Sequence, residues 1–133
     1  MQKIILMLAL CGLTFASEIE IKELKRMIRF AVQNGDIFLL EKFVDFPELN
    51  PINLDNQHGY KMLSVACWAG QEAVVEFLLE HGADVNAINN VKPGKFTALD
   101  VATLSNQEDI AEYLKTKGAK SFSDLENINN LQC

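Results

Sequence analysis

Apolar residues recur at helical spacing through the middle of the chain. Two short segments show this pattern, the first with Met62, Leu63, Ala66 and Cys67 and the second with Val74, Val75, Leu78 and Leu79. Gly70 separates the segments, and Gly82 follows the second at a place where helices often end on a residue of positive φ. The pattern predicts two short helices, each with one apolar stripe.

The same pattern occurs again 36 residues further along the chain, where residues 102–119 align with residues 66–83. A third and weaker copy lies upstream, at residues 31–44. A helix pair of this size cannot cover its own apolar faces, so the copies are expected to stack and share one continuous core.

Residues 59–66 read Gly-Tyr-Lys-Met-Leu-Ser-Val-Ala, and residues 97–102 read Thr-Ala-Leu-Asp-Val-Ala. Together with residues 74–87 they resemble the ankyrin repeat, whose first half carries Gly-x-Thr-Pro-Leu-His-x-Ala. The resemblance covers about residues 22–120. It implies an all-α ankyrin-repeat solenoid of about three stacked helix-turn-helix units with projecting β-turn fingers.

This chain departs from the motif at several positions. Lys61, Met62 and Ser64 replace Thr, Pro and His in the second unit, while Ala98 and Asp100 replace Pro and His in the third. In the family these side chains tie neighbouring turns through hydrogen bonds. We therefore expect the ties to be partly missing and the stability of the stack to be modest.

The repeat divides the chain into a signal peptide, a repeat domain and a tail. The predicted parts are residues 1–16, residues 17–120 with units of about 22–54, 55–87 and 88–120, and residues 121–133. The first unit is interpreted as the N-terminal cap, with charges between its inward residues Leu24, Ile28, Ala31, Leu39, Leu40 and Phe43. The third, with Lys115 in place of a leucine, is interpreted as the C-terminal cap.

Two interpretations of the tail stay open. It could form a short helix that Ser123 and Glu126 cap, or it could fray beyond Phe122 and Leu125, which would then shield the last unit.

The N-terminal segment has the layout of an export signal. Lys3 is followed by an apolar run from Ile4 to Leu13 and by Thr14-Phe15-Ala16, which suits cleavage after Ala16. A membrane anchor would need about 20 apolar residues, so no membrane span is expected after signal removal. A lipid anchor on Cys11 is an alternative, although Leu10 is bulky for such a signal.

The net charge and the number of cysteines narrow the range of partners and of fold types. Cleavage removes Lys3 from the 12 basic side chains, so 11 remain against 18 acidic ones, a net charge of −7. Nucleic acid is therefore not expected as a partner. Cys67 occupies a small core position, and with Cys133 alone it makes no disulfide framework.

The sequence offers no catalytic set, no metal site and no cofactor motif. His58 and His81 lie outside any nucleophile motif, and Glu72, Glu76 and Glu80 recur along one predicted helix face as a solvated stripe. An enzyme is therefore not expected.

The sequence offers more residues suited to binding another protein than to catalysis. In ankyrin repeats the variable surface comes from the finger tips and from the exposed turn of each first helix. Here these map onto Gln33, Asn34, Gln57, His58, Tyr60, Trp68, Ala69, Lys92, Lys95, Phe96, Leu104 and Ser105. Tyr60 and Trp68 are candidate interface anchors. Alternatively, Trp68 covers the junction with the first unit near Gln33, and Phe96 folds back on its own turn.

These features predict an exported, monomeric protein-binding module that stabilises, assists or inhibits one partner protein. The expected compartment is the bacterial periplasm, with secretion as the alternative. Two other hypotheses remain, an immunity protein that neutralises a secreted toxin and a secreted effector that binds a host protein.

The mature protein is expected to begin at Ser17, because Thr14 and Ala16 meet the small-residue requirement of signal cleavage. N-terminal sequencing of the protein from its native cell checks this expectation. A soluble cytoplasmic protein that still begins at Met1 would contradict export.

Overall fold

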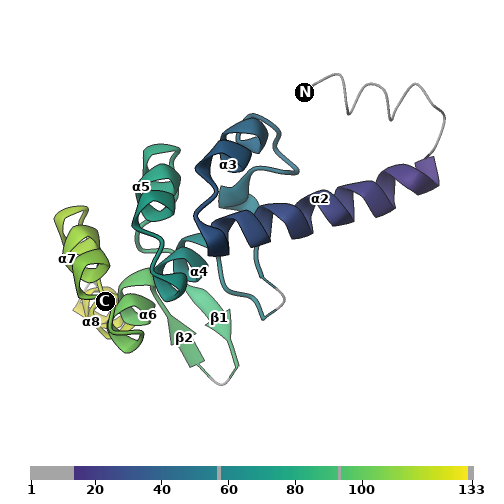
Figure 1. The fold of residues 1–133 in the computed structure, drawn as a ribbon. Helices are drawn as coiled ribbons and strands as arrows, with labels where there is room; N and C mark the ends of the chain where they lie inside the picture. Colours follow the sequence, from purple (N-terminus) through teal and green to yellow (C-terminus); the bar gives the residue numbers. More distant parts are fainter. Residues whose placement is uncertain (1–13, 57, 93, 132–133) are drawn as a thin grey trace.

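The computed structural model describes residues 14–56, 58–92 and 94–131, and the predicted signal peptide lies mostly outside these ranges. The described chain is mainly helical, with one short pair of strands (Figure 1). The elements in order are α2 (Thr14–Asn34), α3 (Ile37–Phe43), the 3-10 helix η1 (Pro51–Asn53), α4 (Met62–Ala69), α5 (Glu72–Glu80), β1 (Asn89–Val91), β2 (Gly94–Phe96), α6 (Ala98–Leu104), α7 (Glu108–Thr116) and α8 (Phe122–Leu131).

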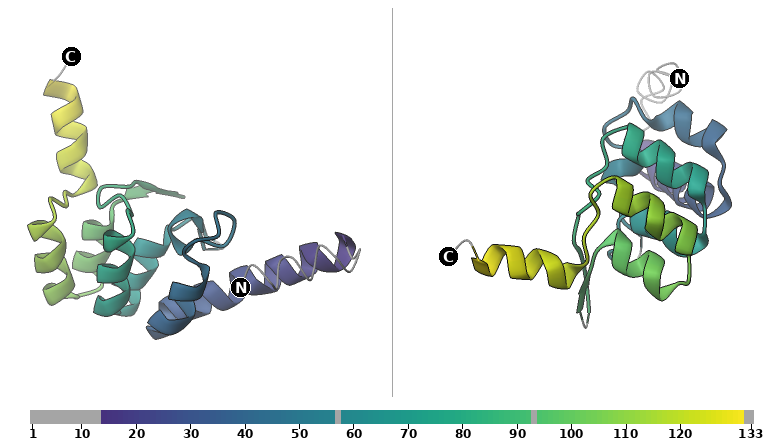
Figure 2. Two further views of the ribbon diagram at one scale, coloured as in Figure 1. Left: turned by 90° about the horizontal axis from the view of Figure 1, so that it is seen from above. Right: turned by 90° about the vertical axis from the view of Figure 1, so that its left-hand side faces the viewer.

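Three helix pairs, α2 with α3, α4 with α5 and α6 with α7, stack as successive layers (Figure 2). Helix α4 lies between α2 and α6 and contacts both. The predicted all-α solenoid of about three units is confirmed. The strands pair antiparallel, with Asn89 opposite Phe96 and Val91 opposite Gly94, and they form the finger between the second and third units.

The turn between the two helices of each pair takes a left-handed residue, at Gly35, Gly70 and Asn106 with φ of 76°, 73° and 58°. At Gly35 a Cβ atom would lie 2.5 Å from Oε1 of Gln71 in the next unit. Gln71 approaches this closely because its Nε2 donates to the Gln33 carbonyl at 2.8 Å. Conformation favours glycine at Gly35, and a Cβ there would also displace the Gln71 side chain from its hydrogen bond, whereas asparagine can supply the conformation at Asn106.

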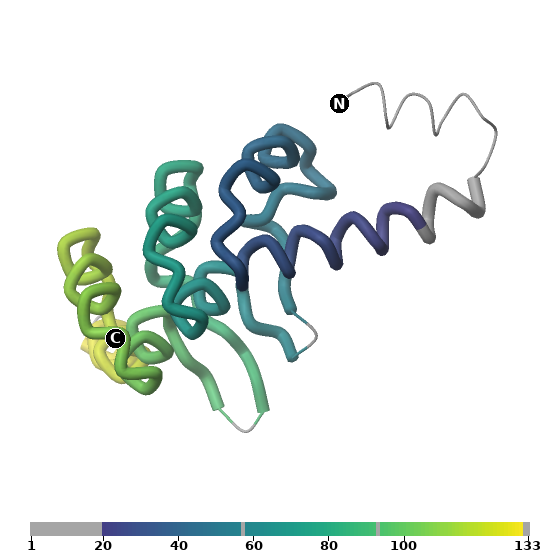
Figure 3. The backbone as a smooth tube through the Cα atoms, in the orientation of Figure 1, coloured from purple at the N-terminus to yellow at the C-terminus, as the bar shows by residue number. Residues whose placement is uncertain are grey.

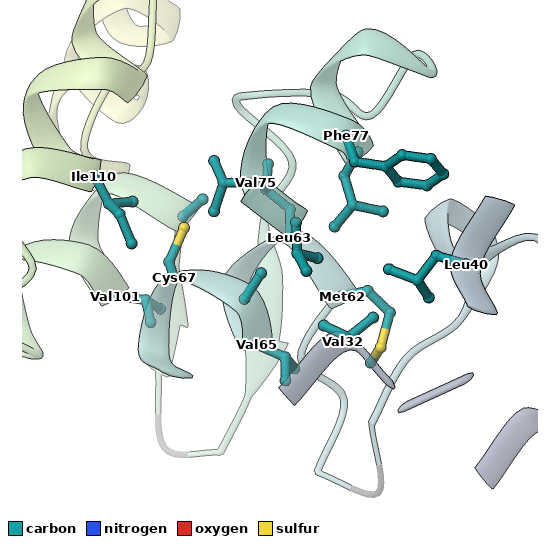
Figure 4. Close-up of a cluster of buried hydrophobic side chains, with 14 of the residues drawn as sticks. Val32, Leu40, Met62, Leu63, Val65, Cys67, Val75, Phe77, Val101 and Ile110 are labelled. Atoms are coloured by element: carbon teal, nitrogen blue, oxygen red, sulfur yellow. The ribbon is translucent and has the colours of Figure 1, made fainter. Parts of the chain in front are cut away.

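The core runs without interruption through all three units. Figure 4 shows Met62 beside Val32 and Leu40 of the first unit, and Cys67 beside Val101 and Ile110 of the third. The stripe residues predicted to face the stack are buried, namely Met62, Leu63, Ala66, Cys67, Val74, Val75 and Leu78, while Leu79 is half-buried.

The tail forms a helix, so the expectation of a frayed end is wrong for residues 122–131. The proposed cap is also wrong, because the Asp124 amide donates to Oγ of Ser121 at 3.1 Å, two residues before Ser123. Phe122 and Leu125 are half-buried, but no residue of α8 is fully buried.

Of the residues predicted to face inward in the first unit, Ile28, Ala31, Leu40 and Phe43 are buried and Leu24 and Leu39 are half-buried. Its outer side exposes three large apolar side chains, Met27 at 47%, Phe30 at 67% and Phe38 at 68%. The earlier expectation considered only the residues that face inward. The other end of the stack does carry polar side chains, with Glu108, Glu112 and Lys115 exposed.

Helix α2 begins at Thr14 and continues past Ala16 and Ser17, the expected cleavage point. Among the described helices, none is both long enough and apolar enough to cross a membrane.

Cys67 is expected to resist thiol reagents in the folded protein. Its side chain is fully buried, and burial raises the pKa of its thiol from 9.0 to about 12. Peptide mapping after maleimide treatment should show Cys67 labelled in urea and protected in buffer. Above about pH 9 the unfolded chain loses this proton while the folded chain keeps it, so the contribution to stability should fall between about pH 9 and 12. Rapid labelling in buffer would contradict the burial.

Candidate protein-binding groove

A groove of about 510 Å³ crosses all three units. It lies on the side of α4 and α6 from which the fingers project, and Figure 3 shows the loop before α4 and the β1–β2 hairpin leaving the same side of the stack. The lining residues are Gln33, Asn56, His58, Tyr60, Ser64, Val65, Trp68, Phe96, Val101, Leu104 and Ser105. Units that are distant in sequence therefore contribute to one surface.

The groove presents apolar side chains that the core does not need. Trp68 is 63% exposed and Leu104 is 71% exposed. Tyr60 and Phe96 are half-buried, with one side packed on the core and the other facing the groove. Trp68 is therefore not buried at the junction with the first unit, and Phe96 both folds back and lines the groove.

Several predicted binding residues lie elsewhere. The Asn34 side chain donates to the Phe30 carbonyl at 2.7 Å within its own helix. Lys92 and Lys95 are exposed on the hairpin and do not line the groove, and Nζ of Lys95 lies 5.9 Å from the centre of the Phe122 ring. Gln57 is outside the described residues. The groove thus holds Gln33, His58, Tyr60, Trp68, Phe96, Leu104 and Ser105 of the predicted set.

Asn56 lines the groove and was missed by the sequence analysis. Its side-chain Oδ1 accepts hydrogen bonds from the backbone N–H groups of His58 and Tyr60, both at 2.9 Å. The backbone N–H of Asn56 donates to the Tyr60 carbonyl at 2.8 Å. These bonds close the first finger and orient Tyr60. An asparagine three residues before Gly59 is a turn signal that could have identified it.

Asn89 joins the second finger to α4. This side chain is almost fully buried, at 1% exposure. Its Oδ1 accepts from the Lys61 amide at 2.7 Å, and its Nδ2 donates to Oγ of Ser64 at 2.7 Å and to the Phe96 carbonyl at 2.9 Å. The turns were expected to lose part of their hydrogen bonds, but at Ser64, which replaces the family's histidine, Asn89 supplies a bond.

Asp100 replaces the family's histidine in the third unit and also links neighbouring segments by hydrogen bonds. Thr97 and Asp100 form a capping box at the start of α6. Oδ2 of Asp100 also accepts from the Phe122 amide at 2.9 Å, and Oγ1 of Thr97 donates to the Lys120 carbonyl at 2.7 Å. These bonds fix the start of α8 against the last unit.

The chemistry of the groove suits recognition. Its described lining contains no carboxylate, lysine or arginine. The Cys67 thiol is buried in the core, where burial raises its pKa, and it does not line the groove. Over the described residues no cluster of His, Cys, Asp and Glu could hold a metal ion. The arrangement can bury an uncharged, largely apolar segment.

Stacked helix pairs, projecting fingers and a groove across them define a helical-repeat solenoid that presents a surface for another protein. The chain belongs to the ankyrin repeat family, because a family model described as ankyrin repeats in three copies matches residues 8–89 and again residues 28–124. Ankyrin repeats are typically interaction modules without enzymatic activity.

Two relatives illustrate the likeness. An ankyrin repeat protein of Acanthamoeba polyphaga mimivirus is 32% identical over 108 residues, covering 71% of this chain and 15% of that protein. The ankyrin repeat and SAM domain-containing protein 6 of Rattus norvegicus is 34% identical over 89 residues, covering 67% of this chain and 10% of that protein. The chain thus matches a small part of each relative, and neither relative is bacterial.

Asn89→Ala is expected to destabilise the fold by about 3 kcal/mol, because it leaves the Lys61 amide and the Ser64 hydroxyl buried without their partner. Urea unfolding followed by circular dichroism measures the change. Asn90→Ala is the matched control, since the neighbouring Asn90 is exposed, and it should alter stability by less than about 0.5 kcal/mol. Equal effects of the two substitutions would contradict the role of Asn89.

Proposed function

We propose that the chain is an exported protein-binding module that takes an uncharged, apolar segment of one partner protein into its groove. The observation that supports this most directly is the exposure of Trp68 and Leu104 beside Tyr60 and Phe96, on a surface that spans three units. Exposed apolar side chains gathered in a hollow are typical of binding sites.

Burial of Trp68 could supply a large share of the affinity. At 63% exposure this residue has roughly 150 Å² left to bury, which corresponds to about 4 kcal/mol at about 25 cal/mol per Å². The hydrogen bonds of Asn56 and Asn89 hold both fingers before a partner arrives. Less ordering is then needed on binding, and more of the contact energy remains as affinity.

Charges next to the groove favour one kind of partner segment. Lys92 and Lys95 are exposed on the β1–β2 hairpin beside an uncharged lining, in a chain whose net charge is −6. A partner that carries an acidic residue next to its uncharged segment, on the side of the hairpin, would match this arrangement. Such rim charges mainly raise the rate of association and its dependence on salt.

Export and the biological role are parts of the proposal that rest on the sequence. The family match begins at residue 8, inside the predicted signal peptide, so the N-terminus of the native protein is the decisive measurement. Mass spectrometry of proteins that co-purify from the native envelope fraction identifies the partner. A tight complex with a co-produced toxin would indicate an immunity protein, and recovery outside the producing cell bound to a host protein would indicate an effector.

Trp68→Ala is expected to weaken binding to the co-purified partner by at least about 2 kcal/mol, because the substitution removes the largest exposed anchor of the groove. The free energy of unfolding should change little, since the side chain is mostly exposed. Isothermal titration calorimetry and urea unfolding of the same variant measure both quantities.

Phe38→Ala is the matched control, because Phe38 is 68% exposed but lies outside the groove. It should leave the affinity for the partner unchanged. Trp68 is also the only tryptophan of the chain, so its fluorescence should shift to the blue when the partner covers it. If Trp68→Ala lowers stability and leaves the affinity unchanged, the binding site lies elsewhere, for example on the face of Glu72, Glu76 and Glu80.

A further inference from the structure

The groove holds one side chain whose charge changes near neutral pH. His58, in the finger before α4, lines it, while the rest of the described lining contains no carboxylate, lysine or arginine. An imidazole gains or loses its proton between about pH 5 and 8, whereas a phenol such as that of Tyr60 carries no charge in this range. The charge of the described lining therefore depends on His58.

Hydrogen bonds fix the backbone at His58 and leave its ring available to a partner. The His58 backbone N–H donates to Oδ1 of Asn56 at 2.9 Å, within the network that closes the finger. The side chain is exposed, and among the described residues its ring has no hydrogen-bond or ion-pair partner. A partner segment that fills the groove therefore meets the ring directly.

The carboxylate of the same finger is already paired. Oδ1 of Asp55 lies 3.4 Å from Nζ of Lys61, and the Asp55 carbonyl accepts from Nε of Arg29 at 2.7 Å. Asp55 therefore has two basic side chains beside it before any charge appears on His58.

The other elements around the groove add no carboxylate that faces it. Helix α2 contributes Gln33 to the lining, and helix α4 contains no charged residue. Asp100 of α6 directs its Oδ2 to backbone N–H groups at the starts of α6 and α8, both at 2.9 Å. Lys92 and Lys95 are exposed on the β1–β2 hairpin. A positive charge on His58 would therefore join a basic rim and gain no opposite charge.

We propose that the charge of His58 controls binding in this groove, with the uncharged imidazole as the form that binds. This inference rests on the proposed function, in which an uncharged, apolar segment fills the groove. Such a segment removes water from the lining, and a protonated imidazole would lose its hydration without gaining a counter-charge. Binding should therefore weaken as the pH falls from about 7.5 to about 5.5, and the complex should release a proton when it forms.

The size of the effect is bounded by the single proton involved. One proton changes a dissociation constant by at most about tenfold per pH unit. An ordinary imidazole that had to be completely uncharged in the complex would raise the dissociation constant about tenfold between about pH 7.5 and about pH 5.5. Partial loss of hydration gives less, so a rise of at least about threefold is expected.

The chain offers a matched control, because His58 and His81 are its two histidines. Nδ1 of His81 lies 2.8 Å from the Phe77 carbonyl at the end of α5, and His81 does not line the groove. His81→Gln therefore serves as the control for His58→Gln.

Nile red tests the inference, since this uncharged dye becomes fluorescent in apolar surroundings. Its dissociation constant from the protein is measured at about pH 7.5 and at about pH 5.5, and the ratio of the two values is the readout. The ratio should be at least about threefold for the unchanged chain and for His81→Gln, and close to one for His58→Gln. Circular dichroism at both pH values shows that each chain is folded during the measurement.

Leu104→Ala locates the dye, because Leu104 lines the groove and is 71% exposed, and it should weaken dye binding at both pH values. If the dye does not bind, or if Leu104→Ala leaves its binding unchanged, the proposed function fails and this inference fails with it. If the dye binds in the groove at the same or higher affinity at low pH, only the role of His58 is overturned. The same holds if His58→Gln keeps the ratio of the unchanged chain.

Discussion

Each helix pair of this chain depends on a neighbour to cover one of its sides. Met62 and Val65 are buried beside Val32 of the first unit, and Val101 is buried beside Cys67 of the second. Burial of these residues is the main favourable term in folding, so no unit of this kind is stable alone. In the first unit two positions of this kind are exposed, since Met27 aligns with Met62 and Phe30 aligns with Val65.

Polar side chains then fix how the stacked units and fingers are oriented. Apolar contact alone tolerates small shifts between layers, whereas a buried asparagine must keep all of its hydrogen bonds or lose stability. Asn89 holds the β1–β2 hairpin against the start of α4, and Asp100 does the same for the start of α8. The walls of the groove are therefore positioned by hydrogen bonds that the repeat motif alone does not require.

The repeating part of the fold could be predicted from the sequence, because helical spacing and the glycines at Gly70 and Gly82 are local signals. The exposure of Trp68 followed from the same register, one position after the buried Cys67. Asn89 could not be predicted, because its partners Lys61 and Ser64 lie more than 24 residues away. The exposed Phe30 was also missed, because an apolar residue on a stripe looks the same whether or not a neighbouring unit covers it.

Exposed apolar residues in this molecule thus have two different origins. Phe30 and Met27 occupy positions that the repeat buries elsewhere, so stacking geometry alone explains why they are apolar. Trp68 and Leu104 occupy positions that point away from every layer, where neither the core nor the helix ends need an apolar side chain. Folding therefore gives no reason for Trp68 and Leu104 to be apolar, and this is the physical ground for the binding role proposed for the groove.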